Sequence, residues 1–424
     1  DVERIDAIEI EPDVLAAGDL FDPVSRGALH DPKLKLHIDD ARSYIVASQK
    51  RYDVIISEPS NPWISGIGNL FSREFFEMSR ARLKQGGLFC QWVQLYGLNP
   101  DVLKMIIRTF SAVFPETAIW QSNPADILLV GSMDHFDEFD YQQFSNRLLK
   151  ANPADLAAYL HIYDPMDFFS YFVAGRKNVE ALSSDARFNT DDMPLLEFEA
   201  PFSLYASTEM QNNELLQKHM SIPEIRGYPG PEDVTKEYLF RKCLNFMKLD
   251  IPVDRAWRNA LTPAASMYLS RRQNSLDENS PVRNASLLQA LDYRPATLAP
   301  AYQDIDLVSS AVDIALKDRN RERALHYLEK AEAMPQHIIS HSDLYYRGGM
   351  GLQAMGDMAG AERYLRRSVA TNAYHARAVI ALAELYREER RMPLACEAYR
   401  SAERLLNGAK RAEVREKMRS SCAP

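Results

Sequence analysis

Cysteine is scarce in this chain, and its spacing excludes common cysteine-based sites. The four cysteines are Cys90, Cys243, Cys396 and Cys422, and no two of them form a Cys-X-X-Cys pair. Zinc knuckles and thioredoxin-like redox motifs both need such pairs. Sparse, scattered cysteine fits a reduced compartment, so we expect the chain to act in the cytoplasm.

Long apolar segments are also missing. No run approaches the roughly 18 apolar residues that a transmembrane helix needs, so we predict no membrane span in this chain. The sequence starts at Asp1 with neither an initiator methionine nor a signal peptide, and a strand pattern begins within a few residues. We therefore expect it to be a piece of a longer polypeptide.

Charge and histidine content limit the possible partners. The formal net charge is −9, and residues 1–300 carry 30 lysines and arginines against 42 aspartates and glutamates. This acidic excess predicts no nucleic-acid partner. His337 and His341 have a spacing that suits a metal on a helix, but no cysteine or carboxylate cluster accompanies them. We predict a surface or packing role for both and no metal site.

Residues 1–132 alternate short apolar strands with helices. This alternation predicts an α/β domain with a parallel sheet covered by helices on both faces. Ligands of such sheets bind beyond the carboxyl ends of the strands. The expected strands are 5–10, 34–38, 52–57, 88–95, 116–121 and 126–132, and the expected helices are 40–49, 73–84 and 100–113.

Acidic residues follow three of these strands. Glu9 closes the first strand, Asp40 follows the second, and Glu58 follows the third. A carboxylate in the place of Glu9 can accept hydrogen bonds from ribose hydroxyls, and one in the place of Asp40 can accept from an adenine amino group. Each acid alone also fits an ordinary surface position, but three at one sheet edge indicate a binding site.

The segment after the third strand, SEPSNPW (57–63), has the most distinctive sequence. Gly66 and Gly68 follow it closely. Two prolines and two glycines predict a loop of defined shape. Trp63 in this loop either lines a substrate lid or packs on the sheet.

From about residue 304 the pattern changes to paired amphipathic helices. Small or apolar residues recur at offsets of 37 and then 34 residues, close to the 34-residue period of the tetratricopeptide repeat. We predict three stacked helix pairs that bind a protein or peptide, with a generic helical bundle as the alternative. The recurring sets are Val312, Gly349 and Ala383; Ala324, Ala361 and Ala395; Leu328, Leu365 and Tyr399; and Ala331, Ser368 and Ala402.

The N-terminal motifs resemble the spermidine/spermine synthase family over roughly residues 1–132. The resemblance implies a Rossmann, methyltransferase-like fold that transfers an aminopropyl group from decarboxylated S-adenosylmethionine to an amine. The SEPSNPW loop, the segment NTDDMPLLEFEAP (189–201) and the repeat-bearing tail are similar to a bacterial subgroup often fused to an N-terminal membrane domain. The family motifs are IEIEPDV (8–14), LKLHIDDA (34–41), YDVIISEPSNPW (52–63), NLFSREFFE (69–77) and LKQGGLFCQ (83–91).

This resemblance also implies how the cosubstrate binds. Glu9 matches the family's ribose-binding acid, and Asp40 with Ala41 matches its adenine-binding Asp-Gly pair, with alanine in place of glycine. The family's first strand and glycine-rich loop would lie before Asp1, as would the membrane domain of the subgroup. We therefore expect half of a nucleotide site here, no permanently bound cofactor, and membrane attachment only through a preceding domain.

The amine site follows from the same resemblance. Glu58 falls where the family has the Asp that handles the attacking amine, so we expect it to be catalytic. Asn61 replaces a second acid, and Gln91 matches a glutamine near the end of the next strand. We expect both residues, with Trp63, to bind the amine. The position of Glu58 at the end of an apolar strand should bury it and raise its carboxyl pKa.

The sequence thus predicts an enzyme, a transferase of polyamine biosynthesis with a putrescine-like amine as acceptor. Two alternatives stay open: an S-adenosylmethionine-dependent methyltransferase, or a non-catalytic Rossmann-like domain joined to a repeat scaffold for protein binding. The predicted layout is a synthase-like domain at 1–132, a mixed extension at 133–202, a helical connecting region at 203–300, repeats at 301–410 and a tail at 411–424.

Overall fold

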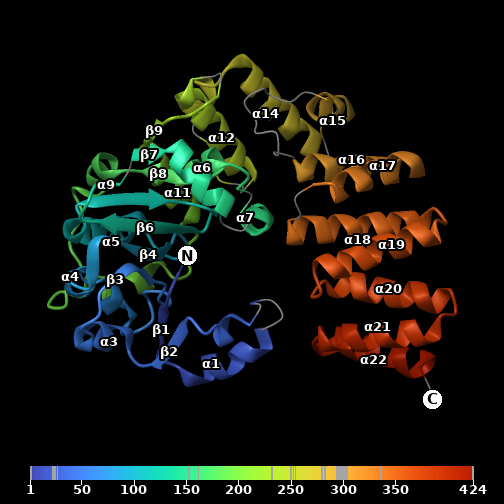
Figure 1. Ribbon diagram of the computed structural model, residues 1–424, viewed down its shortest axis with the longest axis horizontal. Helices are drawn as coiled ribbons and strands as arrows, with labels where there is room; N and C mark the ends of the chain where they lie inside the picture. The colour runs from blue at the N-terminus through green and yellow to red at the C-terminus, as the bar shows by residue number, and fades with distance from the viewer. Residues whose placement is uncertain are drawn as a thin grey trace. The chain divides into compact units, whose positions relative to one another are not determined.

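The computed structural model, drawn in Figure 1, divides into two compact units. The first contains residues 1–140, 169–226 and 245–254, and the second contains residues 141–168, 227–244 and 255–424. The predicted boundary between residues 300 and 301 lies outside the described residues. The structure describes the whole chain except residues 1, 22–24, 26, 137, 151–152, 161, 231–232, 249–250, 252, 254, 278–279, 281–282, 293–303, 335–336 and 423–424.

A mixed sheet organises the first unit and confirms the predicted α/β class. Strands β3 and β4 are parallel, whereas β6 pairs antiparallel with both β4 and β5. Strands β1 and β2 form a separate parallel pair. The strands are β1 Ile5–Glu9, β2 Leu34–Ile38, β3 Tyr52–Ser57, β4 Leu83–Gln94, β5 Glu116–Trp120, β6 Asp126–Ser132, β7 Glu138–Asp140, β8 Phe172–Ala174 and β9 Glu224–Arg226.

An aromatic layer packs two helices onto one face of this sheet. Phe89 of β4 contacts Phe76 of α4 and Phe114 after α5, with ring centroids 5.9 and 5.3 Å apart. All three rings are fully buried. Burying a phenylalanine side chain stabilises a fold by about 1.5–3 kcal/mol, so this layer anchors the two helices to β4.

The helix ends follow from local sequence, with one correction. Ser72 caps α4, because its Oγ accepts from Phe75 N at 3.3 Å. Helix α4 ends at Arg80 rather than near residue 84, and β4 starts at Leu83 rather than Leu88. The strand runs through the two glycines because Gly86 takes a left-handed conformation (φ 71°) beside an irregularity in the β3–β4 register.

The remaining elements of the first unit lie around the sheet (Figure 1). The helices are α1 Pro12–Gly18, α3 Ala41–Ala47, α4 Arg73–Arg80, α5 Pro100–Val113, α9 Arg176–Ser183, α10 Leu195–Glu199 and α11 Glu209–Lys218. Short 3-10 turns are η1 Asp19–Phe21, η2 Ala28–His30, η3 Ile67–Phe71 and η4 Ala200–Ser203.

Side chains link the β1–β2 pair to the five-stranded sheet at the starting ends of β1 and β3. In the described residues no backbone ladder joins β1 to β3. Instead, Asp6 of β1 accepts hydrogen bonds from Lys50 at 3.0 Å and from the hydroxyl of Tyr52 in β3 at 3.2 Å. Burial disfavours the charge of Asp6, but hydrogen bonds from His37 and Lys50 outweigh it and lower the pKa of this carboxyl. On β3, Val54 and Ile56 are 51% and 72% exposed, so the sheet face opposite α4 and α5 is partly uncovered there.

Stacked helix pairs form most of the second unit, in orange to red in Figure 1. Every member of the four recurring sets predicted from the sequence is buried. Gly349 shows why a small residue is needed at such a position, because a Cβ there would lie 2.8 Å from Cγ of Leu365. The helices are α16 Ile305–Lys317, α17 Arg321–Glu332, α18 Ile338–Ala354, α19 Met358–Thr371, α20 Ala376–Glu388, α21 Met392–Arg404 and α22 Gly408–Ser421.

The stack also extends beyond the predicted repeats. Helices α14 Pro263–Leu276 and α15 Arg283–Asp292 pack together and against α16. Leu287 and Ala290 of α15 share a core with Leu307 and Ala311 of α16. The repeat register did not reveal this pair because its buried residues do not match the recurring sets. The other helices that lie wholly or partly in this unit are α6 Tyr141–Lys150, α7 Pro153–Leu160, α8 Pro165–Phe169, α12 Val234–Lys248 and α13 Arg255–Asn259.

A disulfide closes the end of the stack, which the scattered cysteines did not indicate. It joins Cys396 of α21 to Cys422 after α22, with Cα atoms 5.7 Å apart. Cys90 and Cys243 are free thiols. The 26-residue separation of the bonded pair forms no local motif, so the sequence did not show it. No described helix is long and apolar enough to cross a membrane.

We predict that protonation of His341 destabilises the helical unit. His341 is buried, its Nδ1 accepts from the backbone N–H of His337 at 2.9 Å, and burial lowers its pKa from 6.5 to about 4. The unfolded chain therefore binds a proton between about pH 6.5 and 4 that the folded unit does not. Stability should be fully present above pH 6.5 and fall by about 3 kcal/mol as the pH drops through this window.

The measurement is urea unfolding across that pH range for wild type, His341→Gln and His326→Gln. His326 is exposed, so its replacement serves as the control. His341→Gln should flatten the pH dependence by about 3 kcal/mol, and His326→Gln should leave it unchanged. Parallel pH profiles for wild type and His341→Gln would contradict the prediction.

Candidate active site

The ends of β1 and β2 bring two predicted residues together. Glu9 lies opposite Ile38 in the β1–β2 register, and Asp39 N donates to Glu9 O at 3.1 Å. The carboxylate of Asp40 caps α3 by accepting from Ser43 N at 2.7 Å. Ala41 is the first residue of that helix. Glu9 and Asp40 are both half-buried, so each retains a surface toward which a ligand can bind.

Glu58 stands one residue beyond β3 and is exposed. The burial expected from its strand-end position was therefore wrong. The reason is that the neighbouring β3 side chains Val54 and Ile56 are themselves uncovered. Glu58 still acts on its surroundings. Burial of Cys90 raises the pKa of its thiol to about 11, and the negative charge of Glu58 contributes to this rise. The site thus offers a solvated carboxylate at the end of the sheet.

Residues 58–71, the strand-end loop, carry Asn61 and Trp63. Asn61 Nδ2 donates to the hydroxyl of Tyr96 at 3.3 Å, and the Trp63 ring meets the Tyr96 ring edge-on at 6.2 Å. Trp63 also lies on Gly97, where a Cβ would come within 2.8 Å of the indole. Trp63 was expected either to line a substrate lid or to pack on the sheet. Its contacts with Tyr96 and Gly97 are packing contacts, although the ring stays half-buried.

Gln91 does not reach this surface. It lies opposite Ser57 in the β3–β4 register and is fully buried. Its Nε2 donates to Trp92 O at 3.1 Å. The structure therefore places Gln91 inside the sheet, apart from the open surface formed by Glu58, Asn61 and Trp63.

Sequence reasoning missed several residues that shape the site. Tyr96 follows β4 and contacts both Asn61 and Trp63. Arg42, two residues after Asp40, donates to Asn69 O of the strand-end loop at 3.0 Å. Only the position of Tyr96 just after the predicted fourth strand could have drawn attention to it. The Arg42 contact spans 27 residues, and no local pattern announces it.

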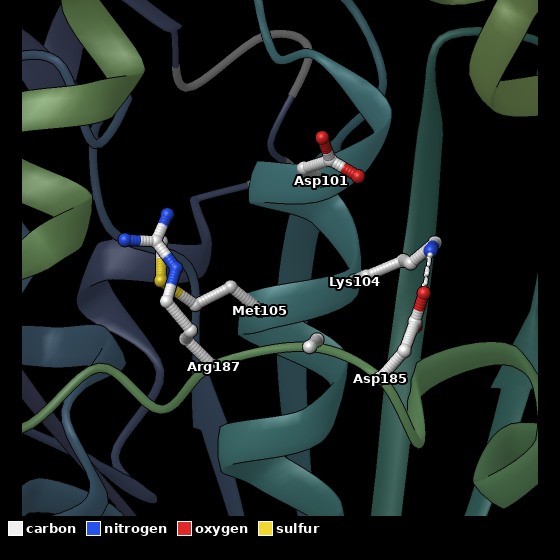
Figure 2. Close-up of a pocket in the computed structure, with 6 residues that line it drawn as sticks. Asp101, Lys104, Met105, Asp185 and Arg187 are labelled. Carbon is white, nitrogen blue, oxygen red and sulfur yellow. Dashed lines mark hydrogen bonds and ion pairs between the residues drawn. The ribbon is translucent and has the colours of Figure 1, made fainter.

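A separate cavity of about 260 Å³ lies on the outer side of α5 (Figure 2). Within it, Lys104 Nζ and Asp185 form an ion pair at 2.8 Å. None of the predicted site residues lines this cavity, so it does not belong to the strand-end site. Among the described residues no cluster of histidine, cysteine and acids is grouped to hold a metal. The cavity is lined by Asp101, Lys104, Met105, Asp185, Ala186 and Arg187.

Comparison with known proteins identifies the class of the first unit. The sequence model of the spermine/spermidine synthase domain matches residues 1–123. Residues 1–123 are therefore similar to the spermine/spermidine synthase domain, a domain of transferases. The family prediction made from the motifs is confirmed.

Individual relatives cover only this part of the chain. Putrescine N-methyltransferase 2 of Nicotiana tabacum is 32% identical over 114 residues, which are 27% of this chain and 32% of that protein. The polyamine aminopropyltransferase of Bacillus subtilis (strain 168) is 26% identical over 122 residues, 29% of this chain and 44% of that enzyme. The chain thus spans between about a third and a half of the length of these curated relatives.

Solved structures give a weaker likeness. A probable spermidine synthase from Corynebacterium glutamicum ATCC 13032 aligns with 19% identity and a TM-score of 0.30, covering 44% of this chain and 63% of that one. The spermidine synthase of Thermotoga maritima aligns with 17% identity and a TM-score of 0.28, covering 46% and 57% respectively.

We predict that Gly97→Ala displaces Trp63. Gly97 is left-handed at φ 62° and an added methyl group would meet the indole. The substitution should cost about 1–2 kcal/mol for the backbone and about 1–3 kcal/mol for the crowding. It should also change the tryptophan emission, and this change should vanish in a Trp63→Phe background.

The control is Gly408→Ala, where φ is 56° and no atom lies within 4 Å of the added Cβ. This variant carries the backbone cost alone. Equal losses of stability in the two alanine variants, with unchanged emission, would show that Trp63 does not pack on Gly97.

Proposed function

We propose that this chain is the aminopropyltransferase-like part of an enzyme of polyamine biosynthesis. The observation that carries the proposal is the Arg42 contact to Asn69 O, at 3.0 Å, which ties the start of α3 to the strand-end loop. Asp40, the proposed adenine-binding residue, is the cap of α3. The loop holds the proposed amine-binding residues Asn61 and Trp63. The two halves of the proposed site therefore adjoin.

The proposed cosubstrate is decarboxylated S-adenosylmethionine, which is not retained as a permanent cofactor. Glu9 would accept from the ribose hydroxyls and Asp40 from the adenine amino group, with Ala41 beside the base. The domain match and the aminopropyltransferase relatives support this choice. The separation between β1 and β3 leads us to propose that full nucleotide affinity requires one more strand between them.

The reaction is a displacement at the carbon next to a sulfonium. The lone pair of the neutral amine forms the new N–C bond, the C–S bond breaks, and its electron pair remains on sulfur in methylthioadenosine. The amine loses one proton. Because Glu58 is exposed, we assign it two tasks: to attract the ammonium form of the acceptor and to accept the proton and pass it to water. The work of the site is to align the amine with the carbon under attack.

The acceptor is proposed to be a short diamine such as putrescine. Asn61 supplies a hydrogen bond where a second carboxylate would supply charge, so the site should hold highly charged polyamines weakly. Gln91 is buried. Its proposed role is therefore to support the sheet beneath the amine, and direct contact with the substrate is left to Glu58, Asn61 and Trp63.

A methyl transfer is the second candidate for this site. The observation that favours it is the similarity to putrescine N-methyltransferases, at 32% identity over 114 residues. Both reactions displace a thioether from a sulfonium, and both can use putrescine. They differ in the group transferred, so product mass distinguishes them when the intact protein is given putrescine with either form of the cosubstrate.

We predict that Glu58→Gln lowers the turnover of the intact protein by about 10²-fold or more, because the amide keeps its size but cannot hold the proton. The measurement is transfer to putrescine with decarboxylated S-adenosylmethionine, followed by mass spectrometry. Asp53→Asn is the matched control, since Asp53 is an exposed acid near the start of β3 and pairs with Lys84 at 2.7 Å.

Wild-type turnover in Glu58→Gln would remove this residue from the mechanism. If the intact wild-type protein transfers neither an aminopropyl nor a methyl group to any amine, the non-catalytic scaffold alternative gains support.

We also propose that the helical unit is a tetratricopeptide-like repeat domain that binds a protein or peptide. Supporting this, α16, α18 and α20 form adjoining first helices of successive pairs. Charged side chains bridge them: Arg347 of α18 pairs with Asp313 of α16, and Arg377 of α20 pairs with Asp343 of α18 at 3.2 Å. Stacked repeats commonly use such a continuous face to bind extended partners.

We predict that peptides selected from a displayed library on the wild-type protein lose affinity by about tenfold or more on Arg377→Ala, the scale of one charged hydrogen bond. Arg377 is 70% exposed, so its loss should leave folding intact. Arg400→Ala, an exposed arginine on α21, is the control and should bind normally. Equal affinity in both variants would argue against this face as the binding surface.

The wider arrangement is likewise a proposal. We propose the layout 1–132, 133–202, 203–300, 301–410 and 411–424, with action in the cytoplasm. Attachment to a membrane through a preceding domain follows only from the resemblance to the bacterial subgroup. The Cys396–Cys422 disulfide is the feature that fits a reducing compartment least.

A further inference from the structure

One carboxylate outside the proposed site grips the strand-end loop. Glu197 of α10 accepts from Ser65 Oγ at 2.9 Å and from the backbone N–H of Gly66 at 3.1 Å. The loop backbone comes close enough that a Cβ on Gly68 would lie 3.3 Å from Glu197 Oε2. Gly66 is itself left-handed at φ 86°, a conformation that glycine adopts without steric cost. A charged acceptor makes these hydrogen bonds stronger than neutral ones.

The gripped turn leads directly to the amine-binding residues. Ile64 N donates to Asn61 O at 3.0 Å, and Ile67 N donates to Ile64 O at 3.1 Å. These bonds join the turn at Ser65 and Gly66 to Asn61 on its N-terminal side. A shift of the turn therefore shifts Asn61 and, two residues later, Trp63.

Two further anchors hold other parts of the same loop. The side chain of Asn189 donates to Gly68 O at 3.1 Å and to Phe71 O at 3.2 Å. Asp191 forms a two-bonded ion pair with Arg42, the residue that also reaches Asn69. Burial opposes the charge of Asp191, but hydrogen bonds from Arg42 and Ser72 outweigh it and lower its pKa. Of the three anchors, Glu197 is the one that holds the turn nearest the amine side.

We propose that Glu197 is a positioning residue for the amine. Glu197 positions the amine without touching it, because it fixes the turn at Ser65 and Gly66. That turn sets the places of Asn61 and Trp63. This inference rests on the proposed function of the strand-end site. Residues 189–197 had no function in the sequence reasoning beyond marking a bacterial subgroup, and the contacts above assign them one.

The nucleotide side should be insensitive to Glu197. Glu9 and Asp40 lie at the ends of β1 and β2, and Arg42 reaches the loop at Asn69 while it pairs with Asp191 outside the loop. Loss of Glu197 therefore frees the turn while leaving in place the Arg42 contact to Asn69, which joins α3 to the loop. The expected signature is a raised KM for the amine with an unchanged KM for the nucleoside cosubstrate.

The test compares Glu197→Ala, Glu197→Gln and Glu199→Ala in the intact protein. Glu199 lies two residues along on the same helix and pairs with Arg187 at 2.6 Å, away from the loop, so it is the matched control. Hydrogen–deuterium exchange of peptides covering residues 64–71 reports the loop, and steady-state kinetics with putrescine reports the site. Thermal unfolding checks that each variant folds.

In Glu197→Ala we expect loop amides to exchange about tenfold faster or more, and the amine KM to rise by a similar factor. Glu197→Gln keeps an acceptor oxygen and should restore part of both losses, and it keeps the test available if the alanine variant does not fold. Glu199→Ala should match wild type. Unchanged loop exchange in Glu197→Ala, or equal changes in Glu199→Ala, would overturn the proposal.

Faster exchange without a rise in amine KM would also overturn it, because Glu197 would then serve stability alone. If the wild-type protein transfers no group at all, the proposed function fails, and with it the role toward the amine. The exchange measurement would still show whether Glu197 holds the loop, so the two failures are distinguishable.

Discussion

The arrangement of the strand-end site depends on one buried amide, that of Asn189, which is 1% exposed. Its Nδ2 reaches Gly68 O and Phe71 O, its Oδ1 accepts from Leu196 N at 3.0 Å, and its backbone N–H donates to Thr109 Oγ1 at 2.9 Å. An unpaired buried amide is costly, so all of these partners must be in place together. The strand-end loop, α5 and α10 are thereby fixed relative to one another.

The aromatic layer beneath the site excludes water from the surroundings of the Asn189 side chain. Phe76, Phe89 and Phe114 press α4 and α5 onto β4, and η3 with its buried Phe71 closes the same core. The dry side of the sheet is thus rigid and tightly packed. The opposite side exposes Val54, Ile56 and the carboxylate of Glu58. A solvated acid beside a rigid loop suits the capture of a cation, because the loop supplies shape while the acid supplies charge.

The helical unit is built on a different principle. Its core repeats a contact between small residues and neighbours from adjoining helices, as at Gly349 and Leu365. Stability therefore accumulates from pair to pair. The disulfide between Cys396 and Cys422 ties the last helix to the stack, where one neighbour is missing. At the other end of the stack, Leu287 of α15 covers α16 through apolar packing.

The sequence by itself determined the elements and the family. Patterns of apolar residues placed β2, β3 and α5 at their observed bounds, and the strand-end acids Glu9 and Asp40 were found because strand ends are visible in the sequence. Tertiary structure alone decided what each side chain faces. Glu58 is exposed because the face of β3 that carries Val54 and Ile56 is uncovered, whereas Gln91 is buried in β4. Glu197 meets Gly66 across 131 residues. Periodicity reports local geometry, whereas burial and long-range hydrogen bonds depend on which distant segments pack against each strand.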